Sequence, residues 1–193
     1  MALADAILVC LTERDMSGYD LAKQFDTSIG FFWRATHPQI YRELRKLKEK
    51  GHVSATEHIQ QGKPDKIVYS LTSSGRKALK AWSLAPVDPP SVKDDLLVRL
   101  YALGDVDSKA LYEQIEIRRR QHDERLQRYV KIKESAYDGR MLTMRQKGKL
   151  KALELGMRYE NSWVEWCNDA LTTLSEDSEV VSLDERRRTR TKG

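Results

Sequence analysis

Residues 36–51, THPQIYRELRKLKEKG, concentrate side chains that can hydrogen-bond to base edges and to phosphates. An arginine pairs bidentately with guanine, and a glutamine amide pairs in the same way with adenine. Gln39, Arg42, Arg45 and Lys46 are therefore candidates for contacts in a DNA groove. The same side chains can instead touch only phosphates or only water, and the sequence leaves those alternatives open.

A helix must hold these side chains in place. Ile40, Leu44 and Leu47 recur at the helical interval and predict one narrow buried stripe. At about 100° per residue, Arg42 and Lys46 fall on the opposite side. The expected ends of this helix are a cap at Thr36, a proline in the first turn at Pro38 and a stop at Gly51. A solvated surface helix has the same pattern, so this window alone does not decide between the two.

Further candidates surround this helix. Main-chain N–H groups at the beginning of a helix favour a phosphate. Residues at the start of the preceding predicted helix are therefore also candidates for DNA contact. Tyr41 flanks the buried stripe, where its hydroxyl can reach a phosphate or its ring can simply pack. The additional DNA-contact candidates are Ser17, Tyr19, Lys23, His37, Tyr41, Lys63 and Lys66.

The flanking elements define a recognisable order. Helical patterns at 3–13 and 18–30 precede the basic helix. The segments 52–59 and 66–71 are rich in β-branched and aromatic residues, and they flank a Gly- and Pro-containing turn at 60–65. A further helix at 73–83 has Thr72 as its cap. This order predicts a mainly α fold with a small β-hairpin wing, a winged helix-turn-helix over residues 1–83.

The remainder of the chain predicts a second, helical domain over residues 92–175. A Pro-rich linker, 84–91, precedes helices at 92–103, 107–134 and 145–174, and a charged tail, 176–193, is expected to be disordered. The two long helices carry apolar stripes that indicate a partner chain. The expected homodimer interface comprises Leu111, Ile115, Leu126, Tyr129, Met157, Trp163, Trp166 and Leu171.

Aromatic side chains raise an alternative for the same region. Flat rings can line a pocket for a small aromatic effector, although at helical spacing they more often form the core of an interface. The candidate ligand residues are Trp33, Tyr159, Trp163 and Trp166.

The charge of the chain agrees weakly with an acidic partner. The net charge is +5, and residues 1–83 hold 13 Lys and Arg against 9 Asp and Glu. Cys10 and Cys167 lack metal-ligand spacing, which indicates reduced thiols in a cytoplasmic protein. No nucleophile, acid pair or phosphate loop indicates an enzyme, a metal or a cofactor, and no segment resembles a membrane helix.

Five segments carry a resemblance to a known family. AILVCLTERDMSGYDLAKQF, IYRELRKLKEKGHV and GKPDKIVYSLTSSGRKAL resemble the PadR family of winged-helix regulators. KDDLLVRLYALG and LELGMRYENSWVEWCNDAL resemble the C-terminal helical domain of its virulence-activator branch. The resemblance extends to about Leu174 and implies a homodimer, held mainly by the C-terminal helices, on a partly palindromic operator. Asp65 departs from the basic residue common in the family's wing, which should weaken a phosphate contact there.

The sequence therefore predicts a homodimeric, sequence-specific DNA-binding transcriptional regulator. Two alternatives share the scaffold. One is a repressor that senses a small aromatic ligand, and the other is a protein-interaction module that binds DNA weakly. The family resemblance does not supply an effector.

Overall fold

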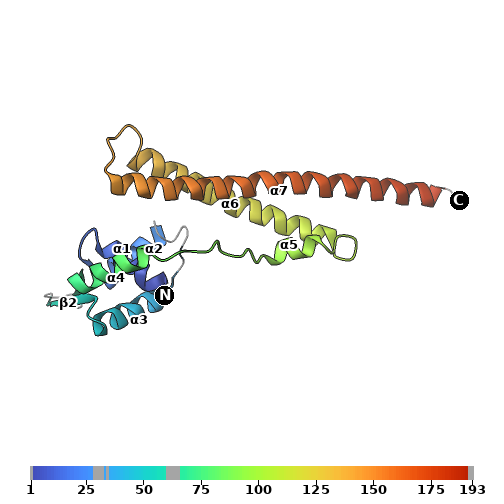
Figure 1. The fold of residues 1–193 in the computed structure, drawn as a ribbon. Coiled ribbons are helices and arrows are strands. Elements are labelled where there is room, and N and C mark those ends of the chain that lie inside the picture. Colours follow the sequence, from blue (N-terminus) through green and yellow to red (C-terminus); the bar gives the residue numbers. More distant parts are fainter. Residues whose placement is uncertain (1, 28–32, 34, 60–65, 191–193) are drawn as a thin grey trace. The chain divides into compact units, whose positions relative to one another are not determined.

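The computed structural model describes residues 2–27, 33, 35–59 and 66–190. The chain forms two compact units, Met1–Pro89 and Pro90–Gly193, called here the winged unit and the helical unit (Figure 1). Residues 84–93, which connect them, are exposed throughout and contain no helix or strand.

The winged unit follows the predicted order, with one addition. Its elements are α1 (Ala2–Leu11), β1 (Met16–Ser17), α2 (Gly18–Thr27), α3 (His37–Glu49), β2 (Val53–His58), β3 (Lys66–Leu71) and α4 (Ser73–Ser83). The apolar stripes of the first three helices meet in one core, which includes Ile7, Leu8, Leu21, Phe25, Ile40, Leu44 and Leu47. The predicted fold class, mainly α with a small β wing, is confirmed, and β1 is the element that the sequence did not indicate.

The three strands form an antiparallel sheet in the order β1-β3-β2. Val53 lies opposite Leu71 and His58 opposite Lys66, so the wing hairpin is in register along its whole described length. On the other edge of β3, Ser17 lies opposite Val68. This pairing ties the beginning of α2 to the wing.

The turn between α3 and β2 is fixed by main-chain and side-chain hydrogen bonds. Gly51 has a φ of 67°, and its N–H and that of His52 bond to carbonyl oxygens in the last turn of α3. The glycine supplies the left-handed conformation that ends a helix in this way. The hydroxyl of Thr72 then donates to the carbonyl oxygen of Gly51 at 2.7 Å and accepts from the Gly75 N–H at 3.0 Å, which ties α4 to the turn.

The helical unit consists of α5 (Asp95–Leu100), α6 (Ser108–Ala136) and α7 (Met144–Arg190). Asp94 and Asp107 cap α5 and α6 by accepting main-chain N–H groups at 3.0 Å. In Figure 1, α6 and α7 form a long hairpin with α5 beside α6. Its core includes Leu96, Leu111, Ile115, Cys167 and Leu174. None of the helices in the described part of the chain has a stretch both long and apolar enough to span a bilayer.

The end of the chain differs from the sequence prediction. The structure continues α7 to Arg190, where disorder was predicted from residue 176. Residues 157–192 contain no glycine or proline, so the residues that most often end a helix are missing from this stretch.

Candidate nucleic-acid interface

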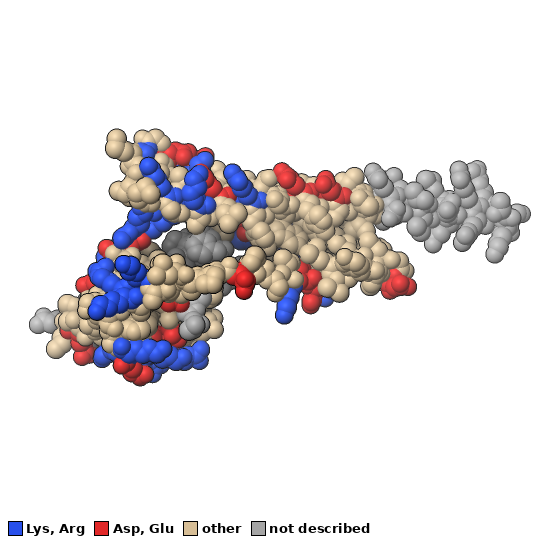
Figure 2. Space-filling model, viewed as in Figure 1, with Lys and Arg blue, Asp and Glu red and all other residues tan. Residues whose placement is uncertain are grey.

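One face of helix α3 is apolar and buried, and the opposite face is cationic and exposed. The side chains of Ile40 and Leu44 have no accessible surface, and that of Leu47 is 2% exposed. Arg42 and Arg45 are exposed on the other side, and Arg42 makes no hydrogen bond or ion pair with any residue that the structure describes. Figure 2 shows Lys and Arg side chains over the edge of the winged unit where α3 runs.

The start of α3 uses one of the predicted contact residues. The side-chain oxygen of Gln39 accepts the Thr36 N–H at 2.8 Å, which satisfies a donor at the beginning of the helix. The predicted pairing of Gln39 with an adenine therefore competes with a capping role. Lys46 Nζ lies 3.5 Å from Glu43 Oε2, and His37 Nε2 lies 3.3 Å from the Asp26 carboxylate at the end of α2. Both remain about half exposed.

Ser17, one of the predicted DNA contacts, is engaged within its own chain. Its side chain is only 5% exposed, and its hydroxyl donates to Asp20 at 2.7 Å and accepts the Asp20 N–H at 3.1 Å. The Ser17 hydroxyl holds the pKa of Asp20 below its ordinary value, and the Lys66 ammonium, 3.1 Å away, acts in the same direction. A carboxylate thus occupies the start of α2 where a phosphate was expected.

The other candidates near α2 are accessible. Tyr19 is 65% exposed, and Lys23 is exposed as well. Tyr41 is 42% exposed, and its ring packs against Gly18, where a Cβ would lie 2.3 Å from the Tyr41 Cε1. The packing alternative for Tyr41 is therefore present, and its exposed surface leaves the phosphate contact as a prediction.

Among the described residues of the wing strands, one DNA-contact candidate is a cation, Lys66. Lys66 begins β3 and pairs with Asp20, so the base of the wing is joined to α2. Lys63 and Asp65 lie outside the described residues.

The predicted dimer residues fall into two groups. Leu111, Ile115 and Tyr129 are at most 2% exposed and pack between helices of their own chain. They leave little accessible surface in the single chain. Those that keep accessible surface are Leu126, Met157, Trp163, Trp166 and Leu171. For these the interface remains a prediction.

Two of the predicted ligand residues, Trp163 and Trp166, pack against neighbouring rings. The Trp163 ring stacks on His122 with the centroids 4.9 Å apart, and the Arg118 guanidinium lies 5.2 Å from the same ring. Trp166 meets Trp163 edge to face at 5.3 Å. Tyr159 and Trp33 are 58% and 38% exposed. Trp163 is therefore engaged by its own helical unit.

A buried polar cluster beside Trp163 was not anticipated from the sequence. His122 Nδ1 lies 2.5 Å from Glu160 Oε2, and Arg125 Nε donates to the same oxygen at 2.9 Å. His122 and Glu160 are each about 5% exposed, and burial lowers the pKa of His122. The only sequence signal was a histidine on the apolar face of α6, which does not reveal a partner 38 positions away.

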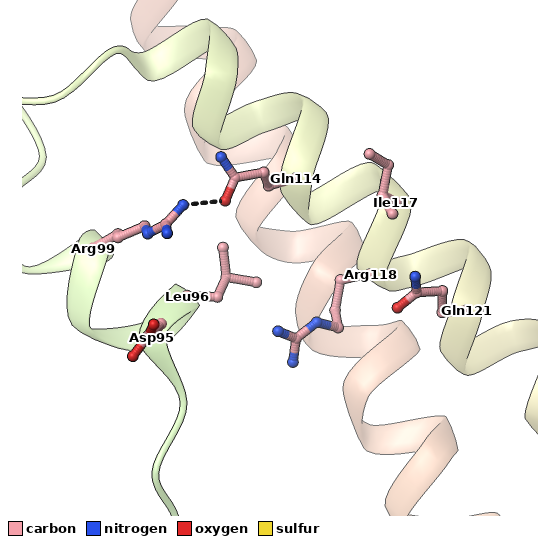
Figure 3. Close-up of a pocket in the computed structure, with 7 residues that line it drawn as sticks. All are labelled: Asp95, Leu96, Arg99, Gln114, Ile117, Arg118 and Gln121. Atoms are coloured by element: carbon pink, nitrogen blue, oxygen red, sulfur yellow. Dashed lines mark hydrogen bonds between the residues drawn. The ribbon is translucent and has the colours of Figure 1, made fainter.

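A cavity of about 260 Å³ lies between α5 and α6, lined by Asp95, Leu96, Arg99, Gln114, Ile117, Arg118 and Gln121 (Figure 3). Both of its guanidiniums already have partners. Arg99 donates to the Gln114 side chain at 2.5 Å, and Arg118 donates to both oxygens of Asp94 at 2.6 and 3.3 Å. Within the described ranges, no three His, Cys, Asp or Glu side chains gather in a way that would hold a metal ion.

A three-helix unit with an outward cationic third helix and an antiparallel wing, followed by a long helical hairpin, defines a winged-helix DNA-binding regulator. Residues 7–81 match the model of the transcriptional regulator PadR-like family, and residues 92–175 match the virulence activator alpha C-terminal domain. The chain belongs to the PadR-like family of transcriptional regulators. The recognised resemblance is thereby confirmed.

Three relatives support this assignment over nearly the full length. The probable transcriptional regulator Rv1176c of Mycobacterium tuberculosis is 38% identical over 192 residues, covering 91% of this chain and 99% of the relative. Bacillus subtilis PadR bound to operator DNA superposes with a TM-score of 0.77 at 27% identity, covering 90% of this chain and 99% of PadR. The Vibrio cholerae virulence activator AphA gives 0.75 at 30% identity, covering 90% and 98%.

The Bacillus subtilis protein is named a negative transcriptional regulator, with 30% identity over 178 residues, which cover 89% of this chain and 97% of PadR. It has also been solved with p-coumaric acid, and that structure matches with a TM-score of 0.72 at 25% identity, covering 91% of this chain and 99% of PadR.

Proposed function

We propose that this chain acts in the cytoplasm as a homodimer that reads a partly palindromic operator through α3. One observation carries the proposal: the apolar stripe of α3 is fully packed into the core while Arg42 and Arg45 stand exposed on its opposite side. A helix fixed in this way presents guanidiniums in the geometry that pairs with guanine edges. The likeness to PadR with operator DNA supports the same reading.

The dimer is supported by apolar surface on the helical unit. Leu155 and Tyr159 lie one turn apart on α7 and are 69% and 58% exposed, and Ile117 on α6 is 46% exposed. Exposed apolar side chains at helical spacing are characteristic of a face that a partner covers. In a twofold dimer on DNA the two α3 helices should lie one turn apart, roughly 34–36 Å, or a multiple of it.

The test of α3 compares two cations of the same helix. An operator is first selected from a random duplex pool with the purified chain, and binding to operator and scrambled duplexes is then measured. Arg42→Ala should cost about 1–3 kcal/mol on the operator and much less on the scrambled duplex. Lys48→Ala is the control, because Lys48 is exposed beside the buried stripe rather than opposite it.

Equal losses on both duplexes for Arg42→Ala would show that α3 clamps phosphates without reading bases. No loss on either duplex would overturn the assignment of α3 as the recognition element, and the alternative of a protein-interaction module would then gain support.

A small aromatic effector is the second candidate, favoured by the likeness to PadR solved with p-coumaric acid. Because Trp163 packs on His122, a ligand that binds at Trp163 must displace this ring pair. Titration with p-coumaric acid should then quench tryptophan fluorescence saturably and weaken operator binding. An unchanged operator affinity at saturating acid would count against effector control.

A further inference from the structure

The excess of positive charge in the helical unit lies at one end. Residues 128–158, which comprise the end of α6, the turn and the beginning of α7, hold 9 Lys and Arg against 3 Asp and Glu. That excess of +6 exceeds the +5 of the whole chain. Figure 2 shows Lys and Arg side chains gathered over this end of the hairpin, which is called here the hairpin tip.

The cations of the tip are accessible. Three of them, Lys147, Lys151 and Arg158, are exposed and fall within one narrow sector of α7. This sector faces away from the side of α7 that carries the buried Leu153 and Glu160. At 1.5 Å per residue, the three side chains extend along about 16 Å of the helix.

The acidic residues of the tip do not neutralise it. Glu154 accepts a hydrogen bond from Lys151 at 2.7 Å, and this bond is the main reason why its pKa lies below the ordinary value. The charges of Lys133 and Arg158 lower the pKa further. Cations from both helices therefore surround a single carboxylate.

From this arrangement, we infer that the hairpin tip is a second nucleic-acid contact, which binds the phosphate backbone of duplex DNA without reading its sequence. The inference rests on the proposed function only in taking DNA as the partner. Exposed lysines and arginines on a helix face are the groups that neutralise phosphates and release counterions. Base readout is not expected here, since phosphate contacts carry no sequence information by themselves.

A second copy of the chain fits the tip less well than DNA does. The rest of the helical unit is acidic, but two of its carboxylates already pair with cationic side chains of their own chain. Asp94 pairs with Arg118, and Glu160 accepts from Arg125 and His122. Interfaces between chains are also depleted of charge at their centres. A polyanion has no such prior partners.

The experiment compares two triple variants of the full chain with the same change in charge. One replaces the tip cations by Lys147→Gln, Lys151→Gln and Arg158→Gln. The control replaces three exposed cations elsewhere in the helical unit, by Lys93→Gln, Lys109→Gln and Arg120→Gln. Binding of each to a selected operator duplex and to a random duplex is measured over a series of salt concentrations.

The tip triple should bind both duplexes more weakly at low salt, with the ratio between them unchanged. Its slope of log affinity against log salt should be shallower than that of the parent by about 2–3 units per protomer, at roughly 0.9 per phosphate contact. The control triple should keep a slope close to that of the parent.

Equal slopes of log affinity against log salt for the two triple variants would overturn the inference. So would dissociation of the tip triple into monomers by sedimentation, which would point to a second copy. Binding to anionic phosphatidylserine vesicles that the tip triple alone loses, with DNA affinity unchanged, would point to a membrane and also overturn it. Arg42→Ala in the same assay separates the two proposals, because its effect on operator preference tests α3 alone.

Discussion

At His122, burial and hydrogen bonding act on the pKa in opposite directions. Removal from water is the larger effect and lowers the pKa, while the hydrogen bond to Glu160 raises it and the nearby Arg125 charge lowers it. The imidazole is therefore neutral in the folded chain near pH 7. Among described residues, its buried Nε2 has no hydrogen-bond partner.

This lowered pKa predicts a pH-dependent stability. Below the ordinary value of 6.5 the unfolded chain binds a proton that the folded chain does not accept. The free energy of unfolding should therefore be fully retained above pH 6.5 and should fall as the pH decreases toward the folded pKa. Urea unfolding followed by circular dichroism between pH 7.5 and 5, values chosen to bracket the titration of an imidazole, measures the effect.

The matched variant for this prediction is His122→Gln, whose amide can still donate to Glu160 but does not titrate. The variant should be less stable at neutral pH and should show a flatter pH dependence than the parent. If parent and variant lose stability in parallel over this range, His122 is not the titrating group.

A second residue-scale prediction concerns Asp94. Its carboxylate caps α5 at Leu96 and binds Arg118 through both oxygens, and the bond to Arg118 is the main reason for its lowered pKa. Asp94→Asn should destabilise the helical unit by about 1–3 kcal/mol, since it replaces a charge-assisted pair. Thermal unfolding of the full chain measures this, and Asp95→Asn, which removes an exposed neighbouring carboxylate, is the control.

At the scale of the elements, two helical glycines give opposite predictions. Alanine has the higher helix propensity, so a glycine with free space around it should be improved by substitution. A Cβ at Gly148 would meet nothing within 4 Å, whereas a Cβ at Gly75 would lie 2.2 Å from the main-chain oxygen of His52. The second contact cannot be relieved by rotating a side chain.

We expect Gly148→Ala to stabilise the chain by about 0.5–1 kcal/mol. Gly75→Ala should destabilise it by about 1–3 kcal/mol, because α4 must move away from the turn after α3. Chemical denaturation of both variants measures the difference in sign. A stabilising Gly75→Ala would show that α4 is not held against that turn.

Local pattern was enough to predict α3 and the wing. One short stretch of sequence indicates both the buried face and the ends of this helix. Its apolar stripe is Ile40, Leu44 and Leu47, with Thr36 before it and Gly51 after it. The strand β1 has two residues and exists only through its pairing with β3, so no window of that length could reveal it.

The surroundings of the candidate DNA-contact residues were less predictable, because the hydrogen-bond and ion-pair partners of these residues are distant in sequence or lie at helix ends. Ser17 was predicted to meet a phosphate from its place before a helix. In the folded chain Ser17 hydrogen-bonds to the Asp20 carboxylate, which also binds Lys66, 46 positions away from Asp20 in the sequence. Gln39 is likewise predicted to face a groove, and in the structure its side-chain oxygen accepts the Thr36 N–H.

For the whole molecule, buried and exposed apolar residues of the helical unit should behave differently. Serine at Leu155 and Tyr159 together should convert the proposed dimer to monomer and leave the fold intact, because both side chains are largely exposed in the single chain. Leu111→Ala should instead destabilise the unit by about 2–5 kcal/mol, as expected for a leucine 2% exposed. Sedimentation and circular dichroism distinguish the two outcomes.

A double serine variant that remains dimeric would place the interface elsewhere on the helical unit. Loss of helical signal in that variant would mean that the two side chains support the fold rather than a partner.

The exposed connection at residues 84–93 acts as a tether, with prolines at 86, 89 and 90. Once one unit has engaged a duplex, a short tether holds the other at an effective concentration on the order of millimolar. Even a contact far too weak to be detected alone would then be occupied much of the time. Lengthening the connection dilutes that local concentration, so the apparent affinity of the intact chain becomes a function of linker length with every contact residue unchanged.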